Sequence, residues 1–345
     1  MIYFVREIAM RNTGKHILLA HALSLALVLL CHTKSVAQGR FYYANGIQEP
    51  ELLFELGITG GAMNCVTDIQ GNPRVYQGPF AGVTLKNTNP TVGLYGAGIW
   101  KDFIGVRFEV NYGMVEGYDS LLDIATARSA IGRYDRNLNF RSKILEFAVT
   151  AEFHPLQVFR SWERDAPRLS PYVFGGLSAF YFNPQAYTAN GWVDLRPLRL
   201  EGQGFSEYPD RREYGKYAFA YPFGIGLRYD VSPKLTLRLE ANKRTTFTDY
   251  LDDVHEPNWV NPALFDKYLP PAQAALAKQL YNRSTKPNLI IPQDTRPRGH
   301  PSENDAFWTV VFKVGFNLNR SGYGGGGGMG AGGKGAAKKL RCPNF

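Results

Sequence analysis

A two-residue alternation of side chains is the feature of this sequence that most restricts its fold. It is clearest in residues 216–254, where two alternating segments are joined by a tight turn at Ser232-Pro233. Successive side chains of a β-strand point to opposite faces, so a period of two predicts strands. One face of each segment is apolar, and the other is small or carries charges of both signs.

The apolar face of the first segment is long. It contains seven apolar residues: Tyr217, Phe219, Tyr221, Phe223, Ile225, Leu227 and Tyr229. A transmembrane β-barrel uses strands of about 9–11 residues that are apolar outside and polar inside. We therefore interpret the two segments as a hairpin of a membrane barrel.

The same pattern recurs along the chain and predicts eight strands. They cover residues 52–63, 91–100, 103–117, a segment ending at Phe153, 171–182, 216–230, 235–242 and 308–316. The connections after the odd-numbered strands are long and the others are shorter, as in outer-membrane barrels with short periplasmic turns. The predicted fold is all-β, an eight-stranded antiparallel transmembrane β-barrel with long extracellular loops. A soluble eight-stranded sandwich or lipocalin-like barrel is the alternative.

The two ends of the chain differ from this body. Basic residues precede an apolar run at residues 17–30, and small residues at 35–37 offer a cleavage site, which predicts a signal peptide at residues 1–37. The outer-membrane barrel is expected at residues 38–318. A Gly-rich basic periplasmic tail is expected at residues 319–345.

The net charge of +9 is concentrated in these ends. Residues 1–37 contribute +3 and residues 320–345 contribute +5, which leaves the barrel close to neutral at +1. A nearly neutral body gives no electrostatic support for nucleic-acid binding, so no nucleic-acid partner is expected.

Charged residues occupy the inward positions of the predicted strands. An eight-stranded barrel encloses only enough space for side chains, and buried charges there must be paired. The expected lumen charges are Glu55, Arg107, Glu109, Glu146, Glu152, Arg228, Arg238, Glu240 and Lys313. An ion or proton path through an open channel is the alternative interpretation.

The sequence favours a protein without catalytic, cofactor-binding or metal-binding residues. It contains no HExxH, GxSxG or P-loop motif. Asp252, Asp253 and His255 near the outer rim are the residues to weigh as a catalytic or metal cluster. The favoured alternative is a loop anchored by carboxylates, and we expect the chain not to be an enzyme.

The last outer loop carries an expected ion pair. If the strands at 235–242 and 308–316 are neighbours, the two ends of this loop meet at the outer mouth. The residues brought together there are Asp249, Asp252, Asp253, Arg298 and Asp305. We predict that Arg298 pairs with the carboxylate of Asp252 or Asp253 and fixes the base of the loop. Between these ends, residues 262–282 predict short helices.

The connection after the fourth strand, from Pro155 to Ser170, is the expected periplasmic contact surface, with the tail as a further candidate. Arginine and aromatic residues are typical of interface centres. This connection carries Arg160, Trp162, Arg164 and Arg168.

Several short strings add a family resemblance that covers roughly residues 50–318. They are SPYVFGG at 170–176, FNP at 182–184, PFGIG at 222–226, TDYLDDV at 248–254, and RGHP at 298–301 with ND at 304–305. Together and in this order they resemble the PorG-type outer-membrane β-barrel proteins of the Bacteroidota type IX secretion system. The Gly-rich basic tail departs from the family pattern.

The resemblance implies a role in protein secretion. Its partners would be outer-membrane lipid and the periplasmic ring proteins of the PorK and PorN type. Two alternatives stay open: an outer-membrane barrel enzyme that acts at the outer rim, and a generic small barrel that stabilises the envelope.

Overall fold

The computed structural model of the chain describes residues 51–69, 85–122, 131–158, 168–284, 298–301 and 304–320. Its strands are β1 (Leu52–Val66), β2 (Asn89–Trp100), β3 (Ile104–Tyr118), β4 (Asn139–Phe153), β5 (Leu169–Tyr181), β6 (Pro184–Thr188), β7 (Gly191–Asp194), β8 (Tyr217–Asp230), β9 (Leu235–Thr246) and β10 (Ala306–Asn317). Its helices are α3 (Ile131–Arg136), α4 (Pro155–Val158), α5 (Ala263–Tyr268) and α6 (Pro271–Leu280), with short 3-10 turns at Leu85–Asn87, Asp119–Leu121 and Arg196–Leu198.

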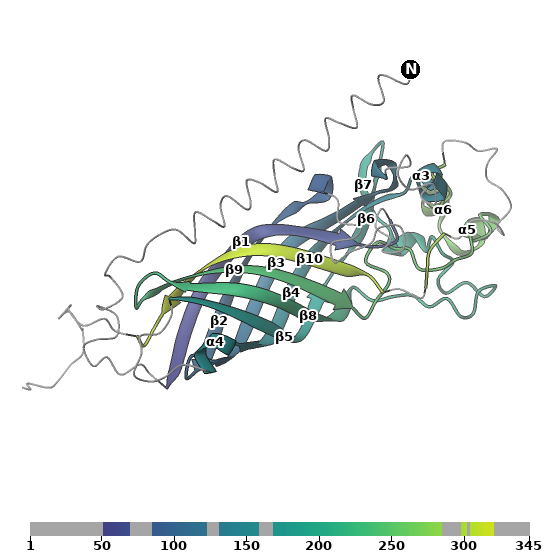
Figure 1. Cartoon of the computed structure of the whole chain (residues 1–345). Coiled ribbons are helices and arrows are strands. Elements are labelled where there is room, and N and C mark those ends of the chain that lie inside the picture. Colours follow the sequence, from purple (N-terminus) through teal and green to yellow (C-terminus); the bar gives the residue numbers. More distant parts are fainter. Residues whose placement is uncertain are drawn as a thin grey trace, which may run out of the picture. The chain divides into compact units, whose positions relative to one another are not determined.

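Eight of these strands form a closed antiparallel barrel. Around the barrel the order is β1, β2, β3, β4, β5, β8, β9 and β10, and β10 pairs with β1 to close the ring. Figure 1 shows these strands side by side and tilted against the long direction of the barrel. The predicted eight-stranded barrel is confirmed, and the ends of the observed strands differ from the predicted ones by a few residues.

The two faces of the barrel wall have opposite character. On β3 the apolar side chains of Val106, Phe108 and Val110 are exposed, whereas Arg107 and Glu109 between them are buried. An apolar exterior around a charged interior is the reverse of a water-soluble protein and matches a hydrocarbon surrounding. The protein is therefore an outer-membrane β-barrel.

The helices of the described residues are short. None of them is long and apolar enough to cross a bilayer. The predicted short helices in residues 262–282 are confirmed by α5 and α6.

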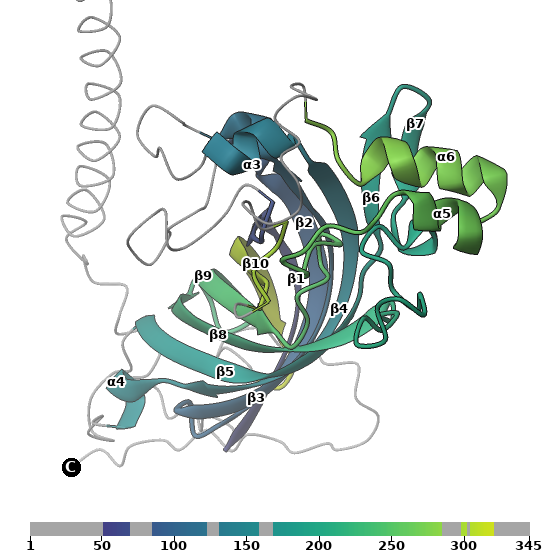
Figure 2. The same ribbon diagram turned by 90° about the vertical axis from the view of Figure 1, so that its right-hand side faces the viewer.

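The long outer loops build a small folded module, called here the outer module. The β6–β7 hairpin extends from β4, and Figure 2 shows it beside α5 and α6 beyond the barrel strands. The module has a hydrophobic core of its own: Ala186, Leu195, Leu198, Leu200, Phe205, Val260, Phe265, Leu269, Ala274, Ala277 and Leu280. The sequence indicated only a polar loop between residues 182 and 215, so this hairpin and core were not predicted.

Two expected segments at the chain ends fall outside the described residues. The signal peptide at residues 1–37 lies there, and so does the tail from residue 321 onward.

The exposed apolar wall leads to a stability prediction. Phe108 is 62% exposed on the outer face of β3, so Phe108→Arg should place a charge in hydrocarbon and cost roughly 2–4 kcal/mol near the bilayer centre. Leu85 is 81% exposed but lies in an outer loop, so the matched change Leu85→Arg should cost much less. Denaturant unfolding in phospholipid bilayers measures both values, and equal costs would contradict the membrane-facing assignment.

Candidate functional site

An ion-pair network fills the middle of the lumen, with Glu152 at its centre. Glu152 accepts hydrogen bonds from Arg107 and, at 2.9 and 3.1 Å, from Nη1 of Arg238. Arg238 also holds Glu55 through two parallel bonds of 2.8 and 3.0 Å. Arg107 reaches on to Glu240, with Nη1 and Oε1 2.8 Å apart. Two guanidinium groups therefore tie together carboxylates from β1, β4 and β9.

The network continues toward the outer end of the barrel. The Lys313 ammonium contacts Glu109 and lies 3.0 Å from a carboxylate oxygen of Glu240. Arg244 pairs with Glu146 at 3.0 Å. The structure places all nine expected lumen charges inside the barrel, and none of them is more than 4% exposed.

A guanidinium from the end of the described chain closes the periplasmic end of the lumen. Arg320 follows β10 and approaches the carboxylates of Asp230 at 2.9 Å and Asp102 at 3.5 Å. Arg228 lies 3.2 Å from the same Asp230. Arg320, which belongs to the predicted tail, is thus held inside the periplasmic end of the barrel.

A small cavity lies among the side chains of the lumen. It has a volume of about 10 Å³ and lies between residues of β1, β2, β3, β9 and β10, among them Thr59, Asn242 and Thr309. That volume is about enough for a single water molecule. The buried ion pairs and this small cavity favour a packed polar core over an open ion path.

A serine, a histidine and a carboxylate lie in line within this core. The two ring nitrogens of His154 lie 3.4 Å from the Ser170 hydroxyl and 3.3 Å from Glu152. Catalytic triads use this order of groups. All three side chains are buried, however, and Glu152 is already bound by two arginines. The hydroxyl is not accessible to a substrate, so we interpret the arrangement as part of the packed core.

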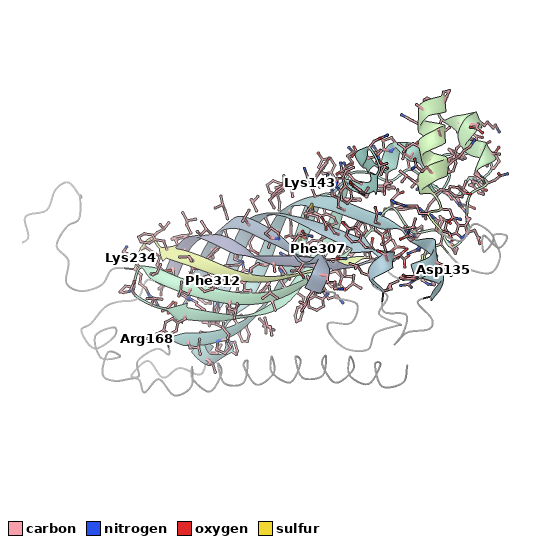
Figure 3. All side chains as sticks on the ribbon, turned by 90° about the horizontal axis from the view of Figure 1, so that it is seen from above. Asp135, Lys143, Arg168, Lys234, Phe307 and Phe312 are labelled. Atoms are coloured by element: carbon pink, nitrogen blue, oxygen red, sulfur yellow. The ribbon has the colours of Figure 1, made fainter. Side chains whose placement is uncertain are left out.

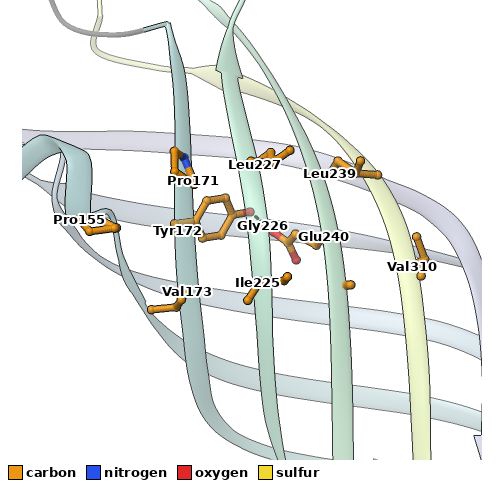
Figure 4. Close-up of a pocket in the computed structure, with 11 residues that line it drawn as sticks. Pro155, Pro171, Tyr172, Val173, Ile225, Gly226, Leu227, Leu239, Glu240 and Val310 are labelled. Atoms are coloured by element: carbon orange, nitrogen blue, oxygen red, sulfur yellow. Dashed lines mark hydrogen bonds between the residues drawn. The ribbon is translucent and has the colours of Figure 1, made fainter. Parts of the chain in front are cut away.

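The outer face of the barrel carries an apolar groove of about 480 Å³. Figure 4 shows it between β5, β8, β9 and β10, with the side chains of Val173, Ile225 and Val310 along it. Beneath it, the Tyr172 hydroxyl donates a hydrogen bond to Glu240 of the lumen network. The exposed apolar lining faces the hydrocarbon of the membrane.

The prediction that Arg298 pairs with the carboxylate of Asp252 or Asp253 is wrong. The Arg298 guanidinium pairs with Glu201, which lies in the long connection between β7 and β8. Its Nη1 also donates to the backbone oxygen of Asp253 at 3.2 Å. Within the described part of the chain, Arg298 forms no ion pair with the carboxylates of Asp252 or Asp253.

Both aspartates are engaged by other groups instead. Asp252 accepts the backbone N–H groups of Ile69 at 2.8 Å and Val254 at 2.9 Å. Asp253 accepts the hydroxyl of Tyr214 at 2.6 Å. The favoured expectation of a loop anchored by carboxylates describes these contacts better than the ion pair does.

The remaining rim residues also lie in the mouth. Asp305 accepts the backbone N–H of Leu251 at 2.9 Å, and Asp249 lies 2.8 Å from Nδ1 of His255. Gly299 packs so closely that a Cβ atom there would lie 2.7 Å from the His255 backbone, which explains why this position is a glycine. The two ends of the last outer loop therefore meet, as predicted.

Burial changes the titration of these mouth residues. It raises the pKa of Asp249 and of Asp253 to about 7. Burial and neighbouring carboxylates also raise the pKa of Asp252 and of Asp305. The hydrogen bond to Asp249 raises the pKa of His255. No group of three or more His, Cys, Asp or Glu side chains in the described ranges is arranged to hold a metal ion.

Most of the expected partner-contact residues cannot be placed. Arg160, Trp162 and Arg164 lie outside the described residues. Arg168 directly precedes β5 and is partly exposed. Figure 3 shows Arg168 and Lys234 at one end of the barrel, the periplasmic end, and Asp135 of α3 at the opposite end.

Comparison with known proteins gives one family match. A family model described as "Domain of unknown function (DUF6089)" matches residues 51–261. No curated protein matches the sequence.

Several solved barrels are similar in structure at low sequence identity. Ail of Yersinia pestis is 8% identical with a TM-score of 0.32, covering 79% of this chain and 100% of its own. Neisserial surface protein A is 8% identical with a TM-score of 0.33, covering 77% and 97%. OprG from Pseudomonas aeruginosa is 10% identical with a TM-score of 0.30, covering 76% and 95%. The barrel assignment itself rests on the strand pairing of this chain.

The lumen network leads to a second stability prediction. Glu152→Gln keeps the shape of the side chain but removes the carboxylate that Arg107 and Arg238 share, and leaves Arg107 with Glu240 and Arg238 with Glu55, so it should cost up to about 3–5 kcal/mol. Glu207→Gln removes an exposed carboxylate from its pair with Lys267 and should change little. Unfolding free energies in bilayers test this, and a Glu152→Gln barrel as stable as the control would contradict the role of the network.

Proposed function

The chain belongs to the DUF6089 family, and we propose that it is a non-enzymatic outer-membrane component of a type IX secretion system that contacts the periplasmic ring. The observation that carries the proposal is the ordered set of strings that resembles the PorG-type barrels. These strings lie where the fold makes close contacts. SPYVFGG and PFGIG lie in the paired strands β5 and β8, and TDYLDDV and RGHP lie at the outer mouth.

The packed lumen supports a role that depends on surfaces. A core of paired charges, with a cavity of about 10 Å³ among them, favours the barrel ends and the lipid-facing wall as contact surfaces. The buried Ser170, His154 and Glu152 give no reason to assign hydrolysis. We therefore propose that the barrel acts as an anchor and not as an enzyme or a channel.

The periplasmic end supplies a suitable contact surface. The turns between β2 and β3 and between β8 and β9 are short, whereas the connection from β4 to β5 is longer. Its helix α4 exposes Leu156 and Val158, and the adjoining Leu169 is also exposed. Exposed apolar side chains beside arginines suit the core of a protein interface. We propose that ring proteins of the PorK and PorN type bind here.

Co-purification from membranes tests the proposal. Wild-type barrel should recover the ring proteins, and alanine at Arg160, Trp162, Arg164 and Arg168 together should remove most of this recovery. Alanine at Arg212, Lys267 and Lys278 on the outer side should leave it unchanged. Heat-dependent migration in detergent gels shows that each variant still forms a barrel. Undiminished ring recovery with the first variant would contradict the proposed contact surface.

A further inference from the structure

The outer mouth buries more carboxylates than it supplies cations for. Seven carboxylates there are at most 8% exposed: Asp68, Asp119, Glu201, Asp249, Asp252, Asp253 and Asp305. The cations near them in the described residues include Arg133, Arg136, Arg211, Arg298 and His255. A buried charge is costly unless it is paired, so this excess requires an explanation.

Three of the seven carboxylates have a basic partner. Arg136 pairs with Asp119 at 2.8 Å, Arg298 pairs with Glu201, and His255 lies 2.8 Å from Asp249. Arg136 also links these groups to the rest of the mouth, because it donates to the backbone oxygens of Asp68 and Arg298.

The other four carboxylates accept hydrogen bonds from neutral groups. Asp68 accepts the backbone N–H of His300 at 2.7 Å. Asp252, Asp253 and Asp305 accept backbone N–H groups or a tyrosine hydroxyl, as described above. One oxygen of Asp253 and one of Asp249 are buried without a hydrogen-bond partner among the described residues. A bare carboxylate oxygen in such a place is unfavourable, whereas a protonated carboxyl is tolerated.

These contacts also join distant parts of the chain. Asp252 holds the segment after β1, Asp68 holds residues 298–301, and Glu201 accepts the backbone N–H groups of His255 and Glu256. We call this set of carboxyls, with their hydrogen-bond partners, the outer-mouth clasp. It fastens both ends of the last outer loop, which joins β9 to β10, to the segment after β1 and to the connection between β7 and β8.

We propose that the outer-mouth clasp is a proton-regulated closure: with protons bound it holds residues 249–256 and 298–301 on the barrel, and loss of those protons at raised pH releases these two segments. The titratable and charged groups around these carboxyls in the described elements include Cys65, Glu116, Arg133, Arg136, Arg196, Arg211, Tyr214, Tyr250, His255, Glu256 and Arg298.

The direction of the pH dependence follows from the raised pKa values. A carboxyl with a higher pKa in the closed state binds its proton more tightly there, so closure is most stable at acid pH. Stability is lost as the pH rises from the ordinary value of 3.8 through about 7 for Asp249 and Asp253. The raised pKa of His255 acts in the same direction, since its contribution is present below 6.5 and disappears at higher pH.

Hydrogen exchange of the wild-type barrel in lipid tests the proposal directly. A single carboxyl whose pKa moves from 3.8 to about 7 changes an opening equilibrium roughly 30-fold between pH 5.5 and pH 8. After correction for intrinsic exchange, amides of residues 249–256 should lose about tenfold or more of their protection at pH 8. Amides of the barrel strands should not change. Equal protection of residues 249–256 at both pH values would overturn the proposal.

Two variants separate protonation from general damage. Asp253 has a positive φ of 65°, a conformation that asparagine tolerates, and Asp253→Asn keeps an oxygen for Tyr214 while removing the charge. This variant should stay closed at pH 8 and show a several-fold smaller pH effect. Asp266→Asn, on exposed α5, should retain the wild-type effect. An unchanged pH effect in Asp253→Asn would contradict the assignment of Asp253, and loss of the effect in Asp266→Asn would contradict the clasp as its source.

Discussion

Backbone hydrogen bonding in hydrocarbon is the constraint on which the rest of this structure depends. Lipid offers no partner to an unpaired N–H or C=O group, so a sheet in the membrane must close on itself. The chain meets this requirement by pairing β10 with β1 over the whole length of β10, from Glu55 with Asn317 to Val66 with Ala306. Once the ring is closed, alternate side chains must face either hydrocarbon or the lumen, and this division accounts for the two-residue period of the sequence.

The narrow lumen imposes the next condition. Eight strands leave room for side chains alone, so the charges that point inward must satisfy one another. Arg107 and Arg238 do this by bridging Glu55, Glu152 and Glu240 from three separate strands. The network occupies the lumen and connects opposite walls of the barrel. We therefore expect the protein to function through its outer surfaces.

Periodicity determines how much of this was predictable. Strand order, facing and the inward position of residues such as Glu240 follow from a local pattern that repeats every two residues. The partner of Arg298 does not, because Glu201 is 97 residues away in a loop without any period. The same holds for the β6–β7 hairpin, whose core forms only when two outer loops pack together. Contacts between loops depend on tertiary packing, so they cannot be predicted from the sequence of either loop alone.

The central claim is that the barrel is filled by its own ion pairs and works through its surfaces. Electrical recording from barrels inserted in a planar lipid bilayer tests this claim most directly, with insertion verified by protease protection of the strands. The account predicts a current equal to that of the bare bilayer at neutral pH and moderate salt. A steady stepwise conductance carried by the folded barrel would contradict it.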